Sequence, residues 1–583
     1  MNNFCNPLNV PYKFQHQNEM ALRESADPTI ILFKGTYYIF ASMSAGFYYS
    51  EDLMNWKYHE NRNLEMYRYA PDVRQVGEYL IFCASRRDEN GPIFRTKDPF
   101  SKQYEKVGEP FEFWDPNVFE DEDGRVYMYW GCDAFAPLFG LEVDCETFEP
   151  LCEVQNLIFG RPEIHGFERK DYPGAEIPEI PPELEELYKK KISEGFSIHA
   201  PYIEGPFINK LAGKYYLQYA GPATEIAQYG DGVYIGDKPL GPFTYQAHNP
   251  FSFRPSGFMT AAGHGSTIED KFGNLWHIST MRISANMRFE RRLGLFPAGL
   301  DKDGILFCNQ HFADYPYQIP QGRFDAYALR PEWMLLSYKK NAKASSCIEG
   351  HGTELAMNEN VQNWWCAKGS AGEWYEMDLG DIYNVHAIQI NFAEESLSAL
   401  KEGADNGGET VKYIEWRYID CSPAVKTRYL LEGSADGETW FVLEDKQEAD
   451  TDLSHDYLHI EGGKKLRYVK ITASQLPYDE KFALSGLRVF GEGHAELPAP
   501  IREVETVKED NLTVRVKWKA VSGAAGYSVR FGIAPDKLYL SYQIYEDTEV
   551  LITALNEGQA CYVRVDSFNE SGITDGTVIQ VEG

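Results

Sequence analysis

The sequence lacks the features of several protein classes. It has no apolar run that approaches the roughly 18 residues of a membrane-spanning helix. Basic side chains are scarce: 56 Lys and Arg residues stand against 88 Asp and Glu residues, so the formal net charge is −32 at pH 7. Because such a chain would be repelled by nucleic acids and by anionic membranes, both are excluded as its main partners.

Residues 1–10 have neither a basic start nor an apolar stretch, so they do not form a secretory signal. The 10 cysteines are scattered and include no CxxC pair, which is typical of reduced thiols that serve as small core residues. Both features predict a cytoplasmic protein. If a leader segment has been removed ahead of residue 1, the protein would be secreted instead.

Helical periodicity is rare, whereas aromatic residues are abundant. Aromatics make up 14% of the chain, with 38 Tyr and 34 Phe, and these side chains favour β structure and suit stacking on sugar rings. The best helical pattern covers 182–192, inside a segment (160–198) that interrupts the strands. The composition therefore predicts an all-β chain with one inserted helical excursion.

A repeated phrase in residues 1–325 predicts the architecture of this region. Each copy has an acidic residue beside a Pro or Gly, an apolar run, a Gly-containing turn and an aromatic strand. The copies are marked by Asp27, Asp72, Asp115, Glu204 and His264, the last of which has His in place of the acid. Five such hairpins predict a five-bladed β-propeller. Because propeller blades point the start of their innermost strand at the central axis, these five side chains are expected to meet in one pocket.

Converging carboxylates indicate a particular chemistry. An acidic residue beside a proline is by itself common at the start of a turn. Because these acids share one position in the repeat, however, we expect them to belong to a functional site. Two carboxyl groups about 6.5–9.5 Å apart, one protonated and one ionised, can hydrolyse a glycosidic bond with inversion. A third acid nearby would raise the pKa of the general acid and orient it.

Five motifs give residues 1 to about 320 a resemblance to a known family. They are Ser25-Ala-Asp27-Pro-Thr, Ala70-Pro-Asp72, Phe113-Trp-Asp115-Pro-Asn, Tyr202-Ile-Glu204-Gly-Pro and Gly263-His264-Gly-Ser. With these motifs the region resembles glycoside hydrolase family 43, whose members are five-bladed propellers that act at chain ends with inversion. The resemblance implies that Asp27 is the general base, that Glu204 is the general acid, and that Asp115 raises the pKa of that acid and orients it.

The resemblance also implies roles for two residues that the repeat alone leaves open. Asp72 is expected to contact the substrate or to support the residues that do. In relatives, a His at the position of His264 faces a metal ion or a water cluster on the axis, so a structural Ca²⁺ beside His264 is one expectation and a buried core histidine is the other. The reaction itself requires no cofactor.

Arginines and the inserted segment are further candidates for the pocket. Four arginines lie within 282–292, and we select Arg288 and Arg292 as the ones that bind sugar hydroxyls; salt bridges to nearby acids are the alternative. The 160–198 segment precedes the strand of Glu204. It either walls off the pocket and restricts it to a chain end, or it is a surface loop.

Three aromatic residues flank predicted inner strands and are candidates for substrate binding. Phe47, Trp114 and Trp130 have rings of the kind that stack on the face of a sugar. Packing between neighbouring blades is the commoner use of such rings in a propeller. We predict that all three contact the substrate.

Two further β units follow the repeat region. Residues 336–492 resemble a discoidin-type jelly roll, a common carbohydrate-binding fold, but 357–365 departs from the turn that relatives carry before the Trp. A sandwich that braces the propeller is therefore the alternative to sugar binding. Residues 498–583 resemble a fibronectin type III module, with Trp518 and Tyr527 as core aromatics, and are expected to be a spacer or brace.

The combined features predict an inverting exo-glycosidase that releases terminal xylose or arabinofuranose from plant cell-wall oligosaccharides, that is, a β-xylosidase or an α-L-arabinofuranosidase. A β-galactofuranosidase or exo-galactosidase is the alternative within the family. A propeller that binds glycans without cleaving them is the alternative outside it, although a lectin needs no matched acid and base. The expected partners are oligosaccharide or polysaccharide chain ends, and the oligomeric state is open.

Overall fold

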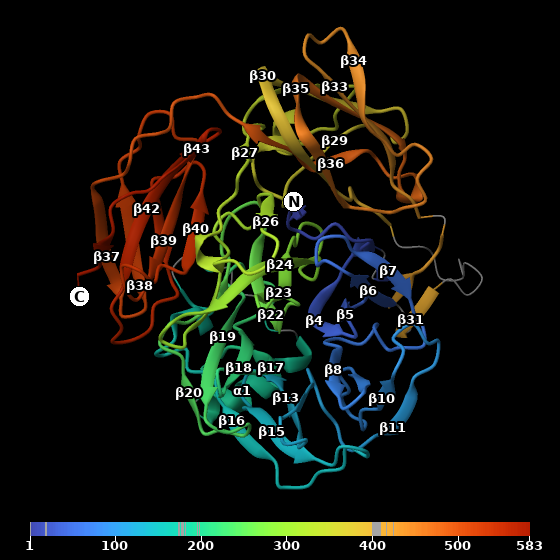
Figure 1. Ribbon diagram of the computed structural model, residues 1–583, viewed down its shortest axis with the longest axis vertical. Helices are drawn as coiled ribbons and strands as arrows, with labels where there is room; N and C mark the ends of the chain where they lie inside the picture. Colours follow the sequence, from blue (N-terminus) through green and yellow to red (C-terminus); the bar gives the residue numbers. More distant parts are fainter. Residues whose placement is uncertain are drawn as a thin grey trace.

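The computed structural model describes residues 2–582 with short gaps, and strands dominate it (Figure 1). The residues outside the description are 1, 18–19, 173–174, 176–179, 181, 195, 198, 399–409, 415–416, 424 and 583. Parts of the 160–198 excursion thus lie outside the described residues. No helix in the described part is both long enough and apolar enough to cross a membrane.

Five antiparallel units of four strands follow one another between residues 26 and 308. The first unit is β4 (Ala26–Phe33), β5 (Thr36–Ser42), β6 (Gly46–Ser50) and β7 (Lys57–Glu60). The second is β8 (Asp72–Val76), β9 (Tyr79–Cys83), β10 (Ile93–Thr96) and β11 (Glu105–Gly108). The third is β12 (Asn117–Glu120), β13 (Val126–Trp130), β15 (Leu138–Val143) and β16 (Gln155–Ile158). The fourth is β17 (Ile203–Leu211), β18 (Lys214–Gly221), β19 (Gly230–Gly236) and β20 (Phe243–Tyr245). The fifth is β22 (Thr260–Glu269), β23 (Leu275–Arg282), β24 (Arg291–Leu300) and β25 (Leu306–Cys308).

The five units close a ring. The first strand of each unit contacts the first strand of the next, and β22 of the last unit contacts β4 of the first. A parallel pair between Gly230 and Ala262 also joins the fourth and fifth units directly. Figure 1 shows these units, coloured blue to green, around a common centre. The innermost strands therefore all begin near one point, which brings together residues far apart in the sequence.

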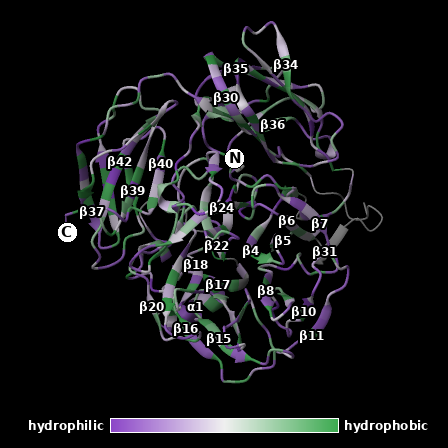
Figure 2. Cartoon of the chain, viewed as in Figure 1, coloured by the Kyte–Doolittle hydropathy of each residue, from purple (hydrophilic) through white to green (hydrophobic). Residues whose placement is uncertain are grey.

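Local sequence explains the repeated hairpin. The glycine of each phrase lies in the turn between the first and second strands, and Gly35, Gly77, Gly124, Gly213 and Gly273 have φ values between 57° and 85°. Residues with a Cβ seldom adopt that region, so glycine suits the turn. The second strands, such as β5, are almost wholly buried, because each unit packs between two others. Figure 2 shows hydrophobic residues along strands such as β4 and β15.

The predicted helix is present. A 3₁₀ turn, η2 (Pro182–Leu184), leads into α1 (Glu185–Ser193). Glu185 and Glu186 lie in its first turn and Lys190 and Lys191 in its last turn, which complements the helix dipole. The helix lies between the third and fourth units in the sequence, so it is an insertion in the ring.

A second region follows the ring. Its eight-stranded sheet has the order β27 (Met334–Leu335), β36 (Ala483–Glu492), β30 (Trp374–Phe392), β35 (His455–Gln475), β33 (Arg428–Ser434) and β34 (Trp440–Asp445), with β28 (Asn341–Ala344) beside β30 and β29 (Trp365–Cys366) beside β36. Short 3₁₀ turns are η3 (Ala326–Ala328), η4 (Thr353–Met357) and η5 (Pro477–Asp479). Trp365, Tyr375 and Val489 belong to a core of its own, so this region folds around separate apolar side chains.

The C-terminal region consists of two sheets. One is β37 (Val504–Asp510), β38 (Thr513–Trp518) and β41 (Glu549–Ile552), and the other is β40 (Leu540–Ile544), β39 (Gly526–Gly532), β42 (Tyr562–Asn569), β43 (Gly572–Thr574) and β44 (Ile579–Gln580). Trp518 and Tyr527 are buried, and their rings lie 5.2 Å apart. In Figure 1 this region, coloured red, lies beside the ring.

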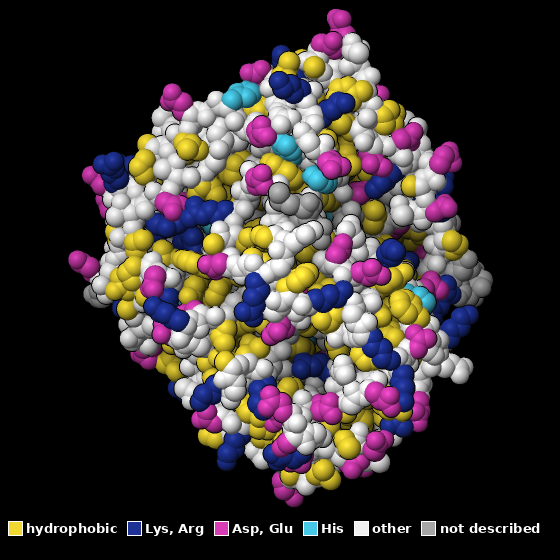
Figure 3. Space-filling model, viewed as in Figure 1, with side chains coloured by type: hydrophobic (Ala, Val, Ile, Leu, Met, Phe, Trp, Pro, Cys, Tyr) yellow, Lys and Arg dark blue, Asp and Glu magenta, His cyan; other side chains and the backbone are white. Residues whose placement is uncertain are grey.

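The second region is not separate from the N-terminus. A four-stranded sheet has the order β3 (Met20–Arg23), β2 (Phe14–Gln17), β32 (Arg417–Asp420) and β31 (Thr410–Ile414), and β1 (Asn2–Phe4) pairs with β26 (Tyr317–Ile319). The buried guanidinium of Arg488 also binds the Glu359 carboxylate and donates to the Asp314 carbonyl. The predicted units 1–325 and 336–492 thus interlock through residues 14–23 and 410–420. On the face shown in Figure 3, acidic and basic side chains are interspersed.

Candidate active site

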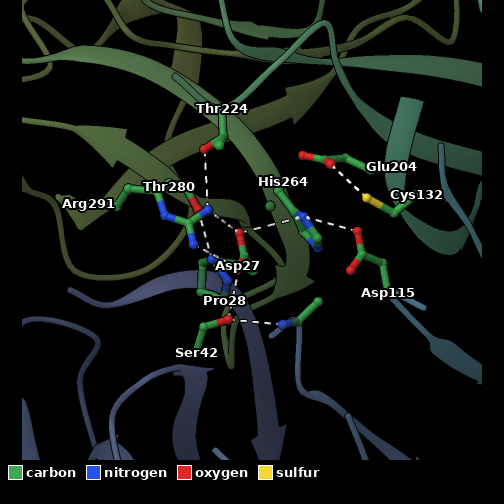
Figure 4. A network of polar contacts seen from close by, with 12 residues as sticks. Asp27, Pro28, Ser42, Asp115, Cys132, Glu204, Thr224, His264, Thr280 and Arg291 are labelled. Carbon is green, nitrogen blue, oxygen red and sulfur yellow. Dashed lines mark hydrogen bonds and ion pairs between the residues drawn. The ribbon is translucent and has the colours of Figure 1, made fainter. Parts of the chain in front are cut away.

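A cavity of about 500 Å³ lies where the innermost strands of the ring begin. Its lining includes four of the five repeat residues, namely Asp27, Asp115, Glu204 and His264. Cavities of this size are typical of small-molecule sites. Figure 4 shows His264 between Asp27 and Asp115, with Glu204 on the side of Asp115. The ring therefore brings together carboxylates that are up to 177 residues apart, from position 27 to position 204.

An unusual backbone conformation directs three of these side chains. Asp27, Asp115 and His264 have φ values of 49°, 53° and 49°, in the left-handed region that residues with a Cβ rarely occupy. Their N–H groups donate to a neighbouring unit: Asp27 to Thr280 Oγ1 (2.8 Å), Asp115 to Ser85 Oγ (2.9 Å) and His264 to Asp231 Oδ1 (2.7 Å). Strain of this kind persists when the surrounding structure holds it, and it clusters at functional sites.

Asp27 is held by a hydroxyl and a guanidinium. Ser42 Oγ donates to its Oδ2 at 2.8 Å, and Arg291 Nη1 donates to its Oδ1 at 3.1 Å. Arg291 Nε also donates to Glu24 Oε1 at 2.8 Å, which fixes the guanidinium from behind. The Asp27 side chain is only 5% exposed. These contacts fix the orientation of the Asp27 carboxylate in the cavity wall.

Glu204 is held by two donors on the opposite side of His264. It pairs across strands with Cys132 of β14 (Cys132–Asp133), whose Sγ donates to Oε2 at 3.1 Å. Tyr229 OH donates to the other oxygen, Oε1. Burial raises the pKa of the Cys132 thiol well above its usual value, so it stays protonated and available as a donor. Both carboxyl oxygens are therefore positioned by side chains of the ring.

Asp115 lies close to Glu204. A carboxyl oxygen of each and the Cys132 sulfur all lie within 4.8 Å of one another. Burial of Asp115 raises its pKa to about 7; the positive charge of His264 opposes this rise, and the carboxylates of Glu204 and Asp27 add to it. Below pH 7 the carboxyl group of Asp115 thus holds a proton next to Glu204. Like charges this close resist joint ionisation.

His264 links the two sides of the cavity. Its Nδ1 lies 3.6 Å from Asp27 Oδ1 and 3.7 Å from Asp115 Oδ2. Burial disfavours the charged imidazole, but the two carboxylates outweigh it and raise the pKa of His264. Gly205 permits this position, because a Cβ there would lie 2.6 Å from the imidazole ring. The imidazole thus lies between the carboxyl groups of Asp27 and Asp115.

The donor set around His264 bears on the expected Ca²⁺. The carboxylates of Asp27 and Asp115 are oxygen ligands of the kind that Ca²⁺ prefers. Metal binding at Nδ1 would require a neutral imidazole, whereas both carboxylates favour the protonated form. Ion pairing and metal binding at this nitrogen are therefore alternatives.

Asp72 does not line the cavity, contrary to the prediction. It is 2% exposed, and it accepts hydrogen bonds from Val118 N (2.7 Å), Asn117 Nδ2 (3.0 Å) and Thr29 Oγ1 (3.3 Å). Ala70, two residues earlier, has the left-handed φ of 48° and donates its N–H to Ser42 Oγ. Ala70 is thus the structural counterpart of Asp27 and Asp115.

Three other predicted substrate contacts lie elsewhere. Phe47 is fully buried and stacks on Phe40 at 4.9 Å. Trp130 packs against neighbouring rings of the third unit. Arg292 is 1% exposed and donates to His455 Nε2 at 2.9 Å, so it joins the ring to the second region. None of the three lines the cavity.

Trp114 and Arg288, both predicted to contact the substrate, line the cavity. The Arg87 guanidinium lies over the Trp114 ring, 4.3 Å from the ring centroid. Arg288 is about half exposed, and its Nη1 lies 3.8 Å from Glu225 Oε1. Both side chains lie where a bound molecule would touch them.

The sequence reasoning missed several cavity residues. Arg291 belongs to the 282–292 cluster. Arg291 and Arg292 are neighbours on one strand, so only one of them can face the cavity, and this could have indicated Arg291. Ser42, Cys132 and Tyr229, which hold the carboxyl groups of Asp27 and Glu204, had no sequence signal, because these contacts depend on how the strands pair. Lys170 and residues of the inserted segment also line the cavity.

Comparison with known proteins supports a family 43 domain. Residues 180–306 match the family described as glycosyl hydrolases family 43. A beta-xylosidase of Xylanibacter ruminicola is 27% identical over 176 residues, which are 29% of this chain and 49% of that protein. An arabinoxylan arabinofuranohydrolase of Paenibacillus polymyxa is 34% identical over 93 residues, which are 15% of this chain and 14% of that protein. The chain thus spans about half of the first relative's length and less of the second's.

Solved structures also resemble the chain. A protein titled glycoside hydrolase is 15% identical, with 80% of this chain and 97% of that one covered and a TM-score of 0.44. A thermostable family-43 glycoside hydrolase is 18% identical, with 55% of this chain and 100% of that one covered and a TM-score of 0.40.

Proposed function

We propose that the ring is a five-bladed β-propeller that hydrolyses glycosidic bonds at chain ends with inversion. Asp27 is the general base that takes a proton from the attacking water, and Glu204 is the general acid that protonates the leaving oxygen. Asp115 orients Glu204 and keeps a proton beside it. The observation that carries this proposal is the placement of two differently held carboxylates in one cavity: Asp27 beside a guanidinium, and Glu204 beside a protonated carboxyl group.

The sugar proposed for the cavity is xylose or arabinofuranose. The relatives named beta-xylosidase and arabinoxylan arabinofuranohydrolase support this choice. β-Galactofuranosidase or exo-galactosidase activity is the alternative within the family. A glycan-binding propeller without activity is less well supported, because binding alone has no use for a matched acid and base.

The regions after the ring are proposed to be a discoidin-like sandwich and a fibronectin type III-like sandwich. Their sheet orders are compatible with sandwiches, and both pack onto the ring. A Ca²⁺ beside His264 remains a prediction. If present, it would supply positive charge between Asp27 and Asp115, and activity would fall on chelation.

A hydrolysis panel tests the function. The purified protein is incubated with nitrophenyl β-xylopyranoside, α-arabinofuranoside and β-galactofuranoside, and then with xylo- and arabino-oligosaccharides. We expect turnover of one pentoside, and NMR of the first product should show the inverted anomer. A retained anomer would contradict the mechanism. Binding of oligosaccharides without cleavage would favour the non-catalytic alternative.

A further inference from the structure

A buried lysine faces the cavity from the inserted segment. Lys170 lies between β16 and β17, lines the cavity and is 8% exposed. Its ammonium lies 4.7 Å from the centre of the Tyr202 ring. Burial lowers the pKa of Lys170 to about 8, against the attraction of Glu225 and Glu204. Lys170 therefore remains largely charged at pH 7.

The Lys170 ammonium can donate hydrogen bonds to a further acceptor. Among the residues that the structure describes, no carboxylate is close enough to form an ion pair with it. Buried ammonium groups normally have such a partner or a hydrogen-bond acceptor. Arg291, by contrast, is saturated by Glu24 and Asp27. An acceptor on a bound molecule would complete the surroundings of Lys170.

Lys170 lies on the leaving-group side of the cavity. The carboxylates that act on its charge are Glu225 and Glu204, and Glu204 is the proposed general acid. In an inverting reaction the acid and the base act on opposite faces of the sugar, so the departing sugar lies next to the acid. Tyr202, whose ring lies beside the Lys170 ammonium, and Tyr188 of α1 also line the cavity. A second sugar that leaves past Glu204 would meet Lys170.

The C-terminal region holds this segment in place. Gly166 of η1 (Gly166–Glu168) donates its N–H to the Leu555 carbonyl at 2.8 Å, and Glu557 N donates to the Ile164 carbonyl at 2.9 Å. A Cβ at Gly166 would lie 2.5 Å from the Leu555 oxygen, so glycine is required for this approach. Arg169, next to Lys170, donates to Asp510 at 2.9 Å. The lysine is thus preorganised by contacts outside the ring.

We propose that Lys170 is a specificity-determining residue that donates hydrogen bonds to hydroxyl oxygens of the sugar on the leaving-group side. This inference rests on the proposed glycosidase function. It assigns the cavity to oligosaccharides of at least two sugars, of which the second is recognised by the inserted segment. Lys170 lies outside the 180–306 segment that matches the family, so the family match does not assign it.

The test compares two substrates of one enzyme. A nitrophenyl glycoside lacks the second sugar, whereas the corresponding disaccharide has it. In Lys170→Met we expect the ratio of kcat/KM for the disaccharide to that for the nitrophenyl glycoside to fall about 10- to 100-fold, the effect of losing a hydrogen bond from a charged donor. Lys189→Met is the matched control: Lys189 is on α1, outside the cavity lining, and its ratio should not change.

Each outcome decides the proposal. An equal loss on both substrates would mean that Lys170 acts only through the charge of Glu204, and an unchanged ratio would mean that it touches no second sugar; either result overturns the proposal. Lys170→Gln, which keeps a polar donor, serves if the Met variant does not fold, and it should give a smaller fall in the ratio. If the unaltered protein cleaves neither substrate, the proposed function fails, which is a different result from an unchanged ratio.

Discussion

The second and third units of the ring both have a proline just before the innermost strand but use their acids differently. Ala70-Pro71-Asp72 and Asp115-Pro116-Asn117 align on their prolines. Ala70 and Asp115 both have left-handed φ values and both donate to a serine of the preceding unit. Asp115, before its proline, lines the cavity, whereas Asp72 and Asn117, after theirs, form hydrogen bonds to other units.

In this comparison, position relative to the strand, rather than residue type, separates an acid that lines the cavity from an acid that joins units. Asp115 has one hydroxyl donor and charged neighbours, and it lines the cavity. Asp72 binds donors of two other units, Asn117, Val118 and Thr29, so it joins three units together. A shift of two residues thus changes the role of an aspartate.

The largest expected effect is on turnover. Asp27→Asn, Asp115→Asn and Glu204→Gln should each lower kcat on an oligosaccharide by about 10²- to 10⁴-fold, because each removes a carboxyl group from proton transfer. Asp72→Asn, assayed well below its melting temperature, should stay within about tenfold of the unaltered protein. A comparable loss in Asp72→Asn would mean that the second unit also serves catalysis.

The next effect is on the pH profile. Because Asp115 has a pKa of about 7, kcat/KM should fall as the pH rises above 7, about tenfold for each further unit, as the proton beside Glu204 is lost. Asp72→Asn should keep this alkaline limb, since Asp72 is outside the cavity. The rates are measured from pH 4 to 9 on an oligosaccharide, whose leaving oxygen needs a proton, and a flat profile up to pH 9 would contradict the role of Asp115.

Replacing Asp115 and replacing Asp72 should shift the melting temperature in opposite directions. The folded pKa of Asp115 is above the usual 3.8, so its contribution to stability is fully present below pH 3.8 and is lost as the pH rises through 7. Asp115→Asn should therefore melt several degrees higher than the unaltered protein at pH 8, with a smaller difference at pH 5. Asp72→Ala should melt lower at both pH values, because each donor left unpaired costs about 1–3 kcal/mol.

The smallest effect concerns two tryptophans of the third unit. Trp114 lines the cavity, whereas Trp130 packs against Phe111 and Phe139. Trp114→Phe should raise KM by a few-fold, in line with the loss of about 1 kcal/mol of stacking, and Trp130→Phe should leave KM unchanged. Steady-state kinetics on one oligosaccharide measures both, and equal KM values for the two variants would remove Trp114 from the site.

Much of the fold followed from local patterns. The repeated phrase predicted five hairpins in 1–325, and the structure has five four-stranded units there. The 182–192 pattern predicted the helix that α1 forms. Such features depend on neighbours along the chain, such as a glycine at a positive φ or an apolar period, so a single sequence contains them.

Local sequence patterns were enough to predict the hairpins, the helix and the presence of Asp27, Asp115, Glu204 and His264 near the starts of inner strands. Only the tertiary structure decided that Asp72 lies between units, that Arg291 rather than Arg292 faces the cavity, and which thiol, hydroxyl and lysine complete the site. The physical reason is that ring closure places side chains from different units in contact. Such a contact depends on the exact register of the strands. A shift of one or two positions places a side chain in different surroundings.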